Sequence, residues 1–270
     1  LTAKVQTPED LQLCRNNLYG IEKKSFPYSL CMTNLILHEV DEPKVYYSNS
    51  LNKNVREYKE SDLFDVILMN PPYGGTEDEI IQMNFPQEFR ASETADLFMA
   101  VIMYRLKTNG RCGVVLPDGF LFGTDNAKVN IKKKLLNEFN LHTVVRMPSS
   151  VFAPYTSITT NILFFDRTGP TTETWFYRLD MPQGYKHFSK TKPMKLEHFQ
   201  EVEAWWNDRV EIKDENTDNY KAKNYTAEEI VSNGYNIDLC GYPTEEKEIL
   251  SPEETMANFI ARREELDREM

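Results

Sequence analysis

The sequence has few of the features that mark membrane, metal-binding and disulfide-rich proteins. No apolar stretch approaches the roughly 20 residues needed to span a bilayer, and the start of the chain has no signal-peptide pattern. We therefore expect no membrane association and a cytoplasmic protein. The four cysteines lie far apart without a CxxC pair, and the four histidines show no metal-ligand spacing. We expect reduced thiols and no metal site.

Positive charge is also scarce. The net charge is −11, whereas contacts to the phosphates of duplex DNA require clustered lysine and arginine. The basic segments 132–134 and 186–195 are more simply explained as solvated surface. If the substrate is DNA, a partner must therefore hold most of it.

A glycine-rich strand-to-helix turn is missing from the beginning of the chain. None precedes Leu18, and the sequence opens at Leu1 in a polar segment without an initiator methionine. We expect from this that the chain is a fragment that lacks an N-terminal part.

The remaining sequence alternates between short apolar runs and helical stretches. The runs lack clean period-two alternation, which suits strands covered on both faces. The predicted strands are 18–21, 45–47, 64–69, 113–116, 141–145 and 161–165, and the predicted helices are 25–38, with Ser25 as N-cap, 93–107 and 125–139. This alternation predicts a doubly wound α/β fold with a mostly parallel, Rossmann-like sheet.

The pattern changes after Arg167. Residues 168–250 are expected to form an appendage of loops, one strand at 174–179 and polar helices, beside a catalytic domain at 1–167. Residues 251–270 open with a capping-box pattern and predict a C-terminal helix with one apolar face. That face could pack on its own domain or bind a partner subunit, and the sequence does not decide between them.

The most informative motif is the tetrad Asn70-Pro71-Pro72-Tyr73, which directly follows an apolar strand. A proline restricts the residue before it to extended conformations and has no backbone N–H. The Asn70 side-chain oxygen and the Pro71 carbonyl can therefore both point outward as acceptors and hold one amino group. Holding both N–H bonds favours the pyramidal amine, whose lone pair can attack a methyl donor. The tetrad thus predicts a site that methylates an amino group.

Tyr73 offers a flat face for a base that has left its stack, a contact worth about 1–3 kcal/mol. The alternative is a turn without function, because Pro-Pro followed by Tyr-Gly-Gly occurs in many loops. The position of the tetrad favours the functional interpretation, because ligands of open α/β sheets bind where strands end.

Several blocks now combine into a family pattern. They are LYGIEK at 18–23, MTNLILH at 32–38, NPPYGG at 70–75, ADLF at 95–98, GRCGVVLPDGFLF at 110–122, VFAPYT at 151–156 and GYNID at 234–238. In order and approximate spacing they resemble the modification (M) subunit of type I restriction-modification systems, an adenine-N6 DNA methyltransferase. The resemblance covers nearly the whole chain.

The resemblance implies roles for further residues. Glu22 would bind the ribose hydroxyls of S-adenosylmethionine, although it could also be a solvated carboxylate at a helix start. Asn49 stands where related enzymes often place an aspartate near the cofactor's adenine. Phe152 would supply a second face for the flipped adenine, although an aromatic beside Val151 is often core. Family members also have a helical domain and then a first strand followed by a glycine-rich turn before these blocks, so this chain alone should be inactive.

The sequence thus predicts transfer of a methyl group from S-adenosylmethionine to a flipped adenine of DNA, with the catalytic tetrad Asn70, Pro71, Pro72 and Tyr73. The expected partners are a specificity (S) subunit and a second M subunit, and a restriction (R) subunit is left open. One alternative is a methyltransferase for protein glutamine or RNA guanine, which also use such a tetrad. The other is a non-catalytic assembly subunit that keeps the fold.

Overall fold

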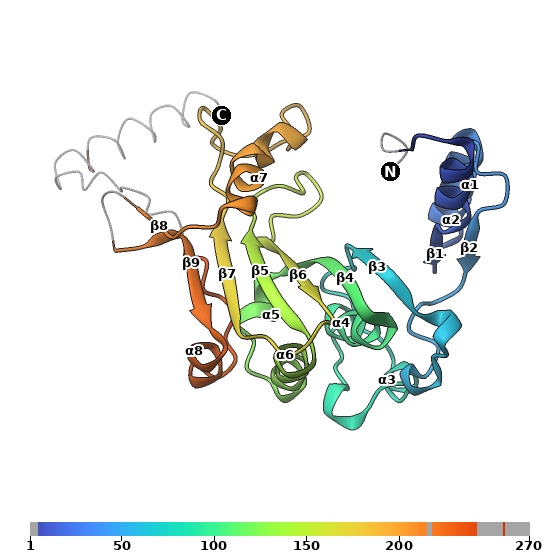
Figure 1. The fold of residues 1–270 in the computed structure, drawn as a ribbon, viewed down its shortest axis with the longest axis horizontal. Helices are drawn as coiled ribbons and strands as arrows, with labels where there is room; N and C mark the ends of the chain where they lie inside the picture. The colour runs from blue at the N-terminus through green and yellow to red at the C-terminus, as the bar shows by residue number, and fades with distance from the viewer. Residues whose placement is uncertain (1–4, 215–217, 242–255, 257–270) are drawn as a thin grey trace.

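The computed structural model describes residues 5–214 and 218–241 together with Met256, and its strands form two sheets (Figure 1). The smaller sheet pairs β1 (Tyr19–Glu22) with β2 (Lys44–Tyr47) in parallel. The larger sheet consists, in spatial order, of β3 (Phe64–Met69), β4 (Leu106–Pro117), β6 (Thr160–Asp166), β5 (Asn140–Arg146), β7 (Glu173–Arg178), β9 (Tyr220–Thr226) and β8 (Ile212–Lys213).

The mostly parallel α/β sheet expected from the sequence is confirmed. β3 pairs in parallel with β4, and β5 with β7. β6 lies antiparallel between β4 and β5, and β9 lies antiparallel between β7 and β8. Consequently β3, β4, β5, β7 and β8 point the same way, and the carboxyl ends of β3, β4 and β5 meet at one edge of the sheet, where ligands of such folds bind.

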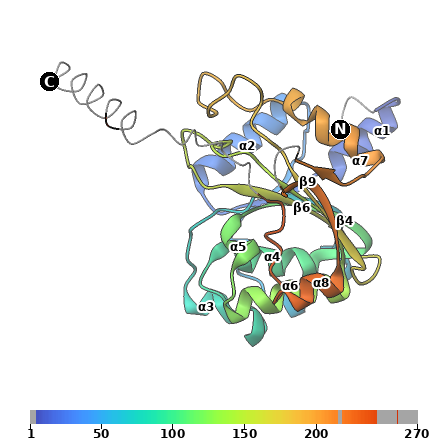
Figure 2. The same cartoon turned by 90° about the vertical axis from the view of Figure 1, so that its left-hand side faces the viewer.

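Helices lie on both sides of the sheets, with α4, α5, α6 and α8 on one side and α1, α2 and α7 on the other (Figure 2). The α-helices are α1 (Pro8–Asn16), α2 (Ser25–Leu37), α3 (Glu79–Gln82), α4 (Thr94–Arg105), α5 (Asp118–Phe122), α6 (Asn126–Glu138), α7 (Gln200–Asn207) and α8 (Ala227–Ser232). Within the described residues, short 3-10 helices accompany them: η2 (Val55–Glu57), η3 (Glu60–Asp62), η4 (Gln87–Phe89) and η5 (Leu196–Phe199).

Helix boundaries follow the local sequence closely, with one correction. Asp125 caps α6 as its position suggests, because its Oδ1 accepts from the Lys128 backbone N–H at 3.0 Å. The prediction that Ser25 caps α2 is wrong. Lys24 is the N-cap, without a side-chain hydrogen bond, and Ser25 is the first helical residue.

Helix α4 is central to the core. Ala95, Leu97, Met99 and Ala100 are fully buried, because α4 packs between β4 and α6. An apolar helix without a polar face is typical of such a position. Since α4 begins next to the end of β3, its burial fixes the neighbourhood of the tetrad.

The larger sheet continues past Arg167, where the sequence suggests an appendage. β7 confirms the predicted strand and pairs with β5, and β9, which was not predicted, pairs with β7 from Glu173↔Thr226 to Tyr177↔Ala222. A second apolar cluster joins Val145 of β5 to Tyr177 of β7 and Trp205 of α7. The division of the chain at residue 167 stays a prediction.

The predicted C-terminal helix at 251–270 lies outside the described residues apart from Met256, whose side chain is exposed. Among the helices that the structure describes, none combines the length and the apolar character needed to cross a bilayer.

A cavity of about 270 Å³ lies between the two sheets, against α4. Tyr19, Gly20 and Ile21 of β1 line it on one side, and residues 64 and 66–69 of β3 line it on the other. Within the described residues, β1 pairs only with β2, and β3 only with β4. A further strand, as the family resemblance implies, would find an unpaired strand on each side here, and its presence stays a prediction.

The two faces of β3 differ in burial, and this generates a prediction about self-association. Both Leu68 and its neighbour Ile67 border the cavity, but Leu68 is 79% exposed, whereas Ile67 is 9% exposed and packs in the core. Exposed apolar edge strands promote association. Leu68→Lys in this chain should therefore reduce concentration-dependent light scattering, with a change of no more than about 0.5 kcal/mol in the free energy of unfolding.

Ile67→Lys is the matched control, because it places the same charge on the buried face of the same strand. It should unfold the chain. If Leu68→Lys unfolds the chain as well, then the Leu68 side of β3 is packed against protein and is not exposed to solvent.

Candidate active site

The tetrad lies where β3 ends. Met69 is the last residue of the strand and pairs with Val114 of β4. The following Asn70 is exposed, whereas Pro71 is buried. Because prolines at 71 and 72 hold the chain extended, Asn70 stands at the tip of the strand on a rigid backbone.

The two glycines after the tetrad allow a tight return of the chain. Gly74 has a φ of +67°, in the left-handed region that favours glycine. A Cβ on Gly75 would lie 2.7 Å from Oγ1 of Thr94, and the Gly75 carbonyl accepts from the Thr94 backbone N–H at 2.9 Å. The start of α4 thus holds the loop that follows the tetrad.

Tyr73 contacts both β3 and β4. Its hydroxyl donates to Asn70 Oδ1 and lies 3.5 Å from the carbonyl oxygen of Val115. Burial raises the pKa of Tyr73 to about 12. The phenol therefore stays protonated at neutral pH, so it can donate a hydrogen bond but cannot serve as a base.

Phe152 comes to the tetrad from the loop between β5 and β6. Its ring centroid lies 6.3 Å from that of Tyr73, with the planes inclined at 61°. The structure therefore brings together the two rings that the sequence analysis paired. They meet edge to face, so a flat molecule between them would require one ring to turn.

A pocket of about 450 Å³ adjoins the tetrad. It is lined by all four tetrad residues and by the two residues to which the sequence analysis assigned the cofactor, namely Asn70, Pro71, Pro72, Tyr73, Glu22 and Asn49. These residues come from the ends of β1, β2 and β3. The carboxyl edges of the two sheets thus share one pocket.

Glu22 and Asn49 each use one side-chain oxygen locally. Glu22 Oε1 accepts from the Lys24 backbone N–H at 2.7 Å, and Asn49 Oδ1 accepts from the Leu51 backbone N–H at 3.0 Å. These bonds fix both side chains in orientation. Within the described residues, Glu22 Oε2 and the Asn49 amide nitrogen remain for a ligand.

Several residues of the pocket wall were not predicted from the sequence. Thr94 and Phe98 of α4, Pro27 of α2, and the ion pair between Lys23 Nζ and Glu77 Oε1, at 3.0 Å, also line it. The block at 95–98, which lies in the first turns of α4, was part of the family pattern, but none of its residues was assigned to the site. No local pattern distinguishes Pro27 or Glu77 from ordinary surface residues.

A buried charge cluster fixes the start of α4 against α6. Lys128 Nζ lies 2.8 Å from Glu93, 2.9 Å from Asp96 and 3.2 Å from Asp125. Asp96 is 1% exposed, and its Oδ1 has no hydrogen-bond partner among the described residues. Burial raises the pKa of Asp96 to about 6 and outweighs the hydrogen bond from Lys128. One ammonium group does not neutralise three carboxylates.

The fold and its sequence relationships place the chain in a family of α/β proteins. The chain belongs to the N-6 DNA methylase family, which it matches over residues 2–249. It is 43% identical over 263 residues to the type I restriction enzyme EcoEI methylase subunit of Escherichia coli, an alignment that covers 97% of this chain and 53% of that subunit.

Solved structures agree with this assignment. A modification subunit of a putative type I restriction enzyme from Vibrio vulnificus YJ016 is similar with a TM-score of 0.79 and 42% identity, over 85% of this chain and 48% of that one. A structure from work on complex assembly and conformational transition of the type I restriction-modification system gives a TM-score of 0.80 and 36% identity, over 98% and 55%. The family resemblance is confirmed, and the chain spans about half the length of these relatives.

The Asp96 cluster predicts a pH dependence of stability. The pKa of Asp96 is about 6 in the fold against a usual 3.8, so protonation favours the folded state. Its contribution to stability is complete below pH 3.8 and is lost as the pH rises through about 6. Asp96→Asn cannot titrate, so from acid to neutral pH the wild type should lose about 1–3 kcal/mol relative to this variant.

Urea unfolding of both chains at several pH values between these limits measures that difference. The exposed Asp65, paired with Lys107 at 2.8 Å, provides a control, and Asp65→Asn should leave the pH profile in this range nearly unchanged. Parallel profiles for the wild type and Asp96→Asn would contradict the raised pKa.

Proposed function

We propose that this chain is the catalytic part of a type I restriction-modification methylase subunit, which transfers a methyl group from S-adenosylmethionine to the N6 amino group of a flipped adenine in DNA. The observation that carries the proposal is the tetrad Asn70-Pro71-Pro72-Tyr73 at the end of β3, on the wall of a pocket shared with Glu22 and Asn49. Membership of the N-6 DNA methylase family supports adenine rather than glutamine or guanine as the target.

In this proposal Asn70 and Pro71 recognise the amino group. The Asn70 oxygen and the Pro71 carbonyl accept its two N–H bonds, which favours the pyramidal amine. Tyr73 already donates to Asn70 Oδ1, an oxygen that can accept a second hydrogen bond. An incoming amino group can therefore share this acceptor with the Tyr73 hydroxyl, or displace that hydroxyl from it.

The rings of Tyr73 and Phe152 would hold the extruded base. They lie close enough to contact one ligand, and both are only partly buried. If one ring turned until the two planes were parallel, the adenine could stack on both faces. Each stacking contact is worth about 1–3 kcal/mol.

The pocket suits the adenosyl part of S-adenosylmethionine, which supplies the methyl group as a sulfonium. The Glu22 carboxylate can accept from ribose hydroxyls, and Asn49 offers amide groups to the adenine. Pro27 and Phe98 add apolar surface beside them. The donor set therefore fits the group on this side of the pocket.

We propose partners from the charge and the relatives. A chain with a net charge of −11 is poorly suited to hold duplex DNA alone. Solved relatives include a type I restriction-modification system studied for its assembly. We therefore propose that a specificity (S) subunit contributes most of the DNA contact, within a complex that contains a second M subunit and can add a restriction (R) subunit.

The assignment of Glu22 can be tested through cofactor affinity. In the complete methyltransferase, Glu22→Ala should weaken S-adenosylmethionine binding by roughly tenfold or more, because a hydrogen bond to a charged group is worth about 1.5–3 kcal/mol. Glu22→Gln should weaken it less, since an acceptor remains for Lys24 and the ribose. Calorimetry measures both variants.

Glu57 is an exposed glutamate outside the pocket, so Glu57→Ala serves as the control and should leave the affinity unchanged. Wild-type affinity in Glu22→Ala would remove Glu22 from the cofactor site.

The tetrad can be tested by separating the methyl-transfer rate from cofactor affinity. In the complete enzyme, Asn70→Ala should lower the single-turnover rate by about 100-fold or more, because the lost acceptor acts mainly on the transition state. S-adenosylmethionine affinity should change little. Parental rates in Asn70→Ala would mean that the tetrad is only a turn.

Tyr73 should behave differently from Asn70. Tyr73→Ala should weaken retention of the extruded adenine by about 1–3 kcal/mol, the value of one stacking contact. Tyr73→Phe is the matched control, because it keeps the ring and removes only the hydroxyl that bonds Asn70. It should retain most of the activity in the same assay.

A further inference from the structure

The loop 147–159, which carries Phe152, is held at its two ends and also before Phe152, where Ser150 Oγ accepts from the Phe188 backbone N–H at 2.9 Å and Val151 packs against the second apolar cluster. It connects β5 to β6, and near its tip the Tyr155 side chain is 93% exposed. At the stem, the Met147 backbone N–H donates to the Thr160 carbonyl at 2.9 Å. The position of the Phe152 ring therefore depends on how this stem is fixed, together with the contacts of Ser150 and Val151.

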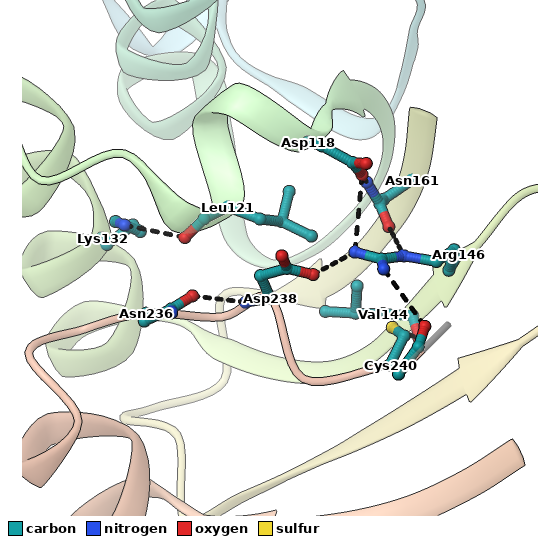
Figure 3. A network of polar contacts seen from close by, with 10 residues as sticks. Asp118, Leu121, Lys132, Val144, Arg146, Asn161, Asn236, Asp238 and Cys240 are labelled. Atoms are coloured by element: carbon teal, nitrogen blue, oxygen red, sulfur yellow. Dashed lines mark hydrogen bonds and ion pairs between the residues drawn. The ribbon is translucent and has the colours of Figure 1, made fainter. Parts of the chain in front are cut away.

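Asp118 joins the stem to the end of β4. Its backbone N–H donates to the Thr159 carbonyl at 3.2 Å, and its carboxylate accepts from the Asn161 amide at 2.6 Å. Arg146, the last residue of β5, lies 3.5 Å from the same carboxylate and donates from Nε to Asn161 Oδ1 at 3.4 Å. The residues that flank the loop on both sides are thus tied to one carboxylate (Figure 3).

A distant part of the chain completes this network. Asp238, which follows α8, accepts from Arg146 Nη2, and the Gly241 carbonyl accepts from Nη1 at 3.1 Å (Figure 3). Its neighbour Ile237 is fully buried and donates its backbone N–H to the Leu121 carbonyl at 3.2 Å. Asp238 is therefore presented to Arg146 by an anchored backbone.

The Arg146 guanidinium is well suited to transmit this constraint. Its side chain is 3% exposed, and its planar fork engages partners in fixed directions. A buried guanidinium needs its partners, so moving one of them forces the others to readjust. Asp118 and Asp238 both contact Nη2, while Nε and Nη1 donate to other acceptors, and this set of partners fixes the plane of the group at the base of the loop.

We infer that Asp238 is a positioning residue for the Phe152 loop and acts through Arg146 and Asp118. The segment 234–241 would thereby stabilise the loop that carries Phe152, through its contacts with Arg146 at the end of β5. The consequence for methyl transfer rests on the proposed function. The bracing itself does not.

A first measurement tests the bracing without any assay of activity. Asp238→Asn in the complete methyltransferase keeps an acceptor for Arg146 and removes the charge. Hydrogen exchange at the backbone amides of Met147 and Asp118, which close the stem, should become about tenfold faster or more. Unchanged exchange at both amides would overturn the inference.

The chain offers a matched control. Arg178 is the parallel-strand neighbour of Arg146, is also buried, and has the carboxylate of Asp214 at 2.8 Å. Asp214→Asn removes a comparable charge from a comparable arginine and should leave the stem amides unchanged. If Asp238→Asn does not fold, Asp238→Glu carries the same test, because it keeps the charge and displaces the carboxylate.

A second measurement tests the consequence for the reaction. Asp238→Asn should slow single-turnover methylation by about tenfold to 100-fold, because a small misplacement of a positioning group has such effects. S-adenosylmethionine affinity should stay unchanged. In a Phe152→Ala background the same substitution should have little effect, since the group that it positions is already gone.

Equal slowing in both backgrounds would show that Asp238 acts on general stability and would overturn the positioning role. If the wild-type enzyme does not methylate adenine, the proposed function fails, whereas the exchange measurement still decides whether Asp238 braces the loop.

Discussion

The parallel pairing of β3 with β4 is the contact on which the candidate site depends. It places Met69 opposite Val114, so the tetrad emerges beside the end of β4, and Tyr73 comes within reach of the Val115 carbonyl. A slip of one residue would turn the side chains of β3 to the opposite face. The register is secured because Ile67 packs in the core, while Leu68 on the other face is exposed.

Features encoded over a few neighbouring residues could be predicted from the sequence. The strand at 64–69 and the tetrad after it are found as expected, because an apolar run and two prolines impose their conformations locally. Most helix limits agree within one or two residues. The family resemblance implied that Glu22 and Asn49 serve the same site as the tetrad, and in the structure they line one pocket with it.

Features that require distant pairing could not be predicted. β9 reads as a polar segment, and it becomes a strand only because β7 offers it a partner. Asp96 resembles an ordinary acidic residue of a first helical turn, and only the packing of α6 on α4 buries it. The contact of Arg146 with Asp238 joins residues 92 positions apart, and neither residue has a local pattern that indicates the other.

Rigid placement of neutral groups distinguishes the tetrad from its surroundings. The acceptors that it presents, the Asn70 amide oxygen and the Pro71 carbonyl, carry no charge, and the raised pKa keeps the Tyr73 phenol neutral as well. Two acidic residues of the adjoining pocket already have partners, since Glu77 pairs with Lys23 and one oxygen of Glu22 accepts from the Lys24 backbone N–H. A site of this kind can orient an amino group but has no strong base to deprotonate it first.

The effect of such a site on a reaction must therefore come from geometry, and this gives weight to every contact that fixes the tetrad or the Phe152 loop. The cluster around Lys128 fixes the start of α4 beside the tetrad, and the cluster around Arg146 fixes the stem of the Phe152 loop. Placing charge there, away from the tetrad, lets strong interactions set the geometry without altering the neutral character of the site.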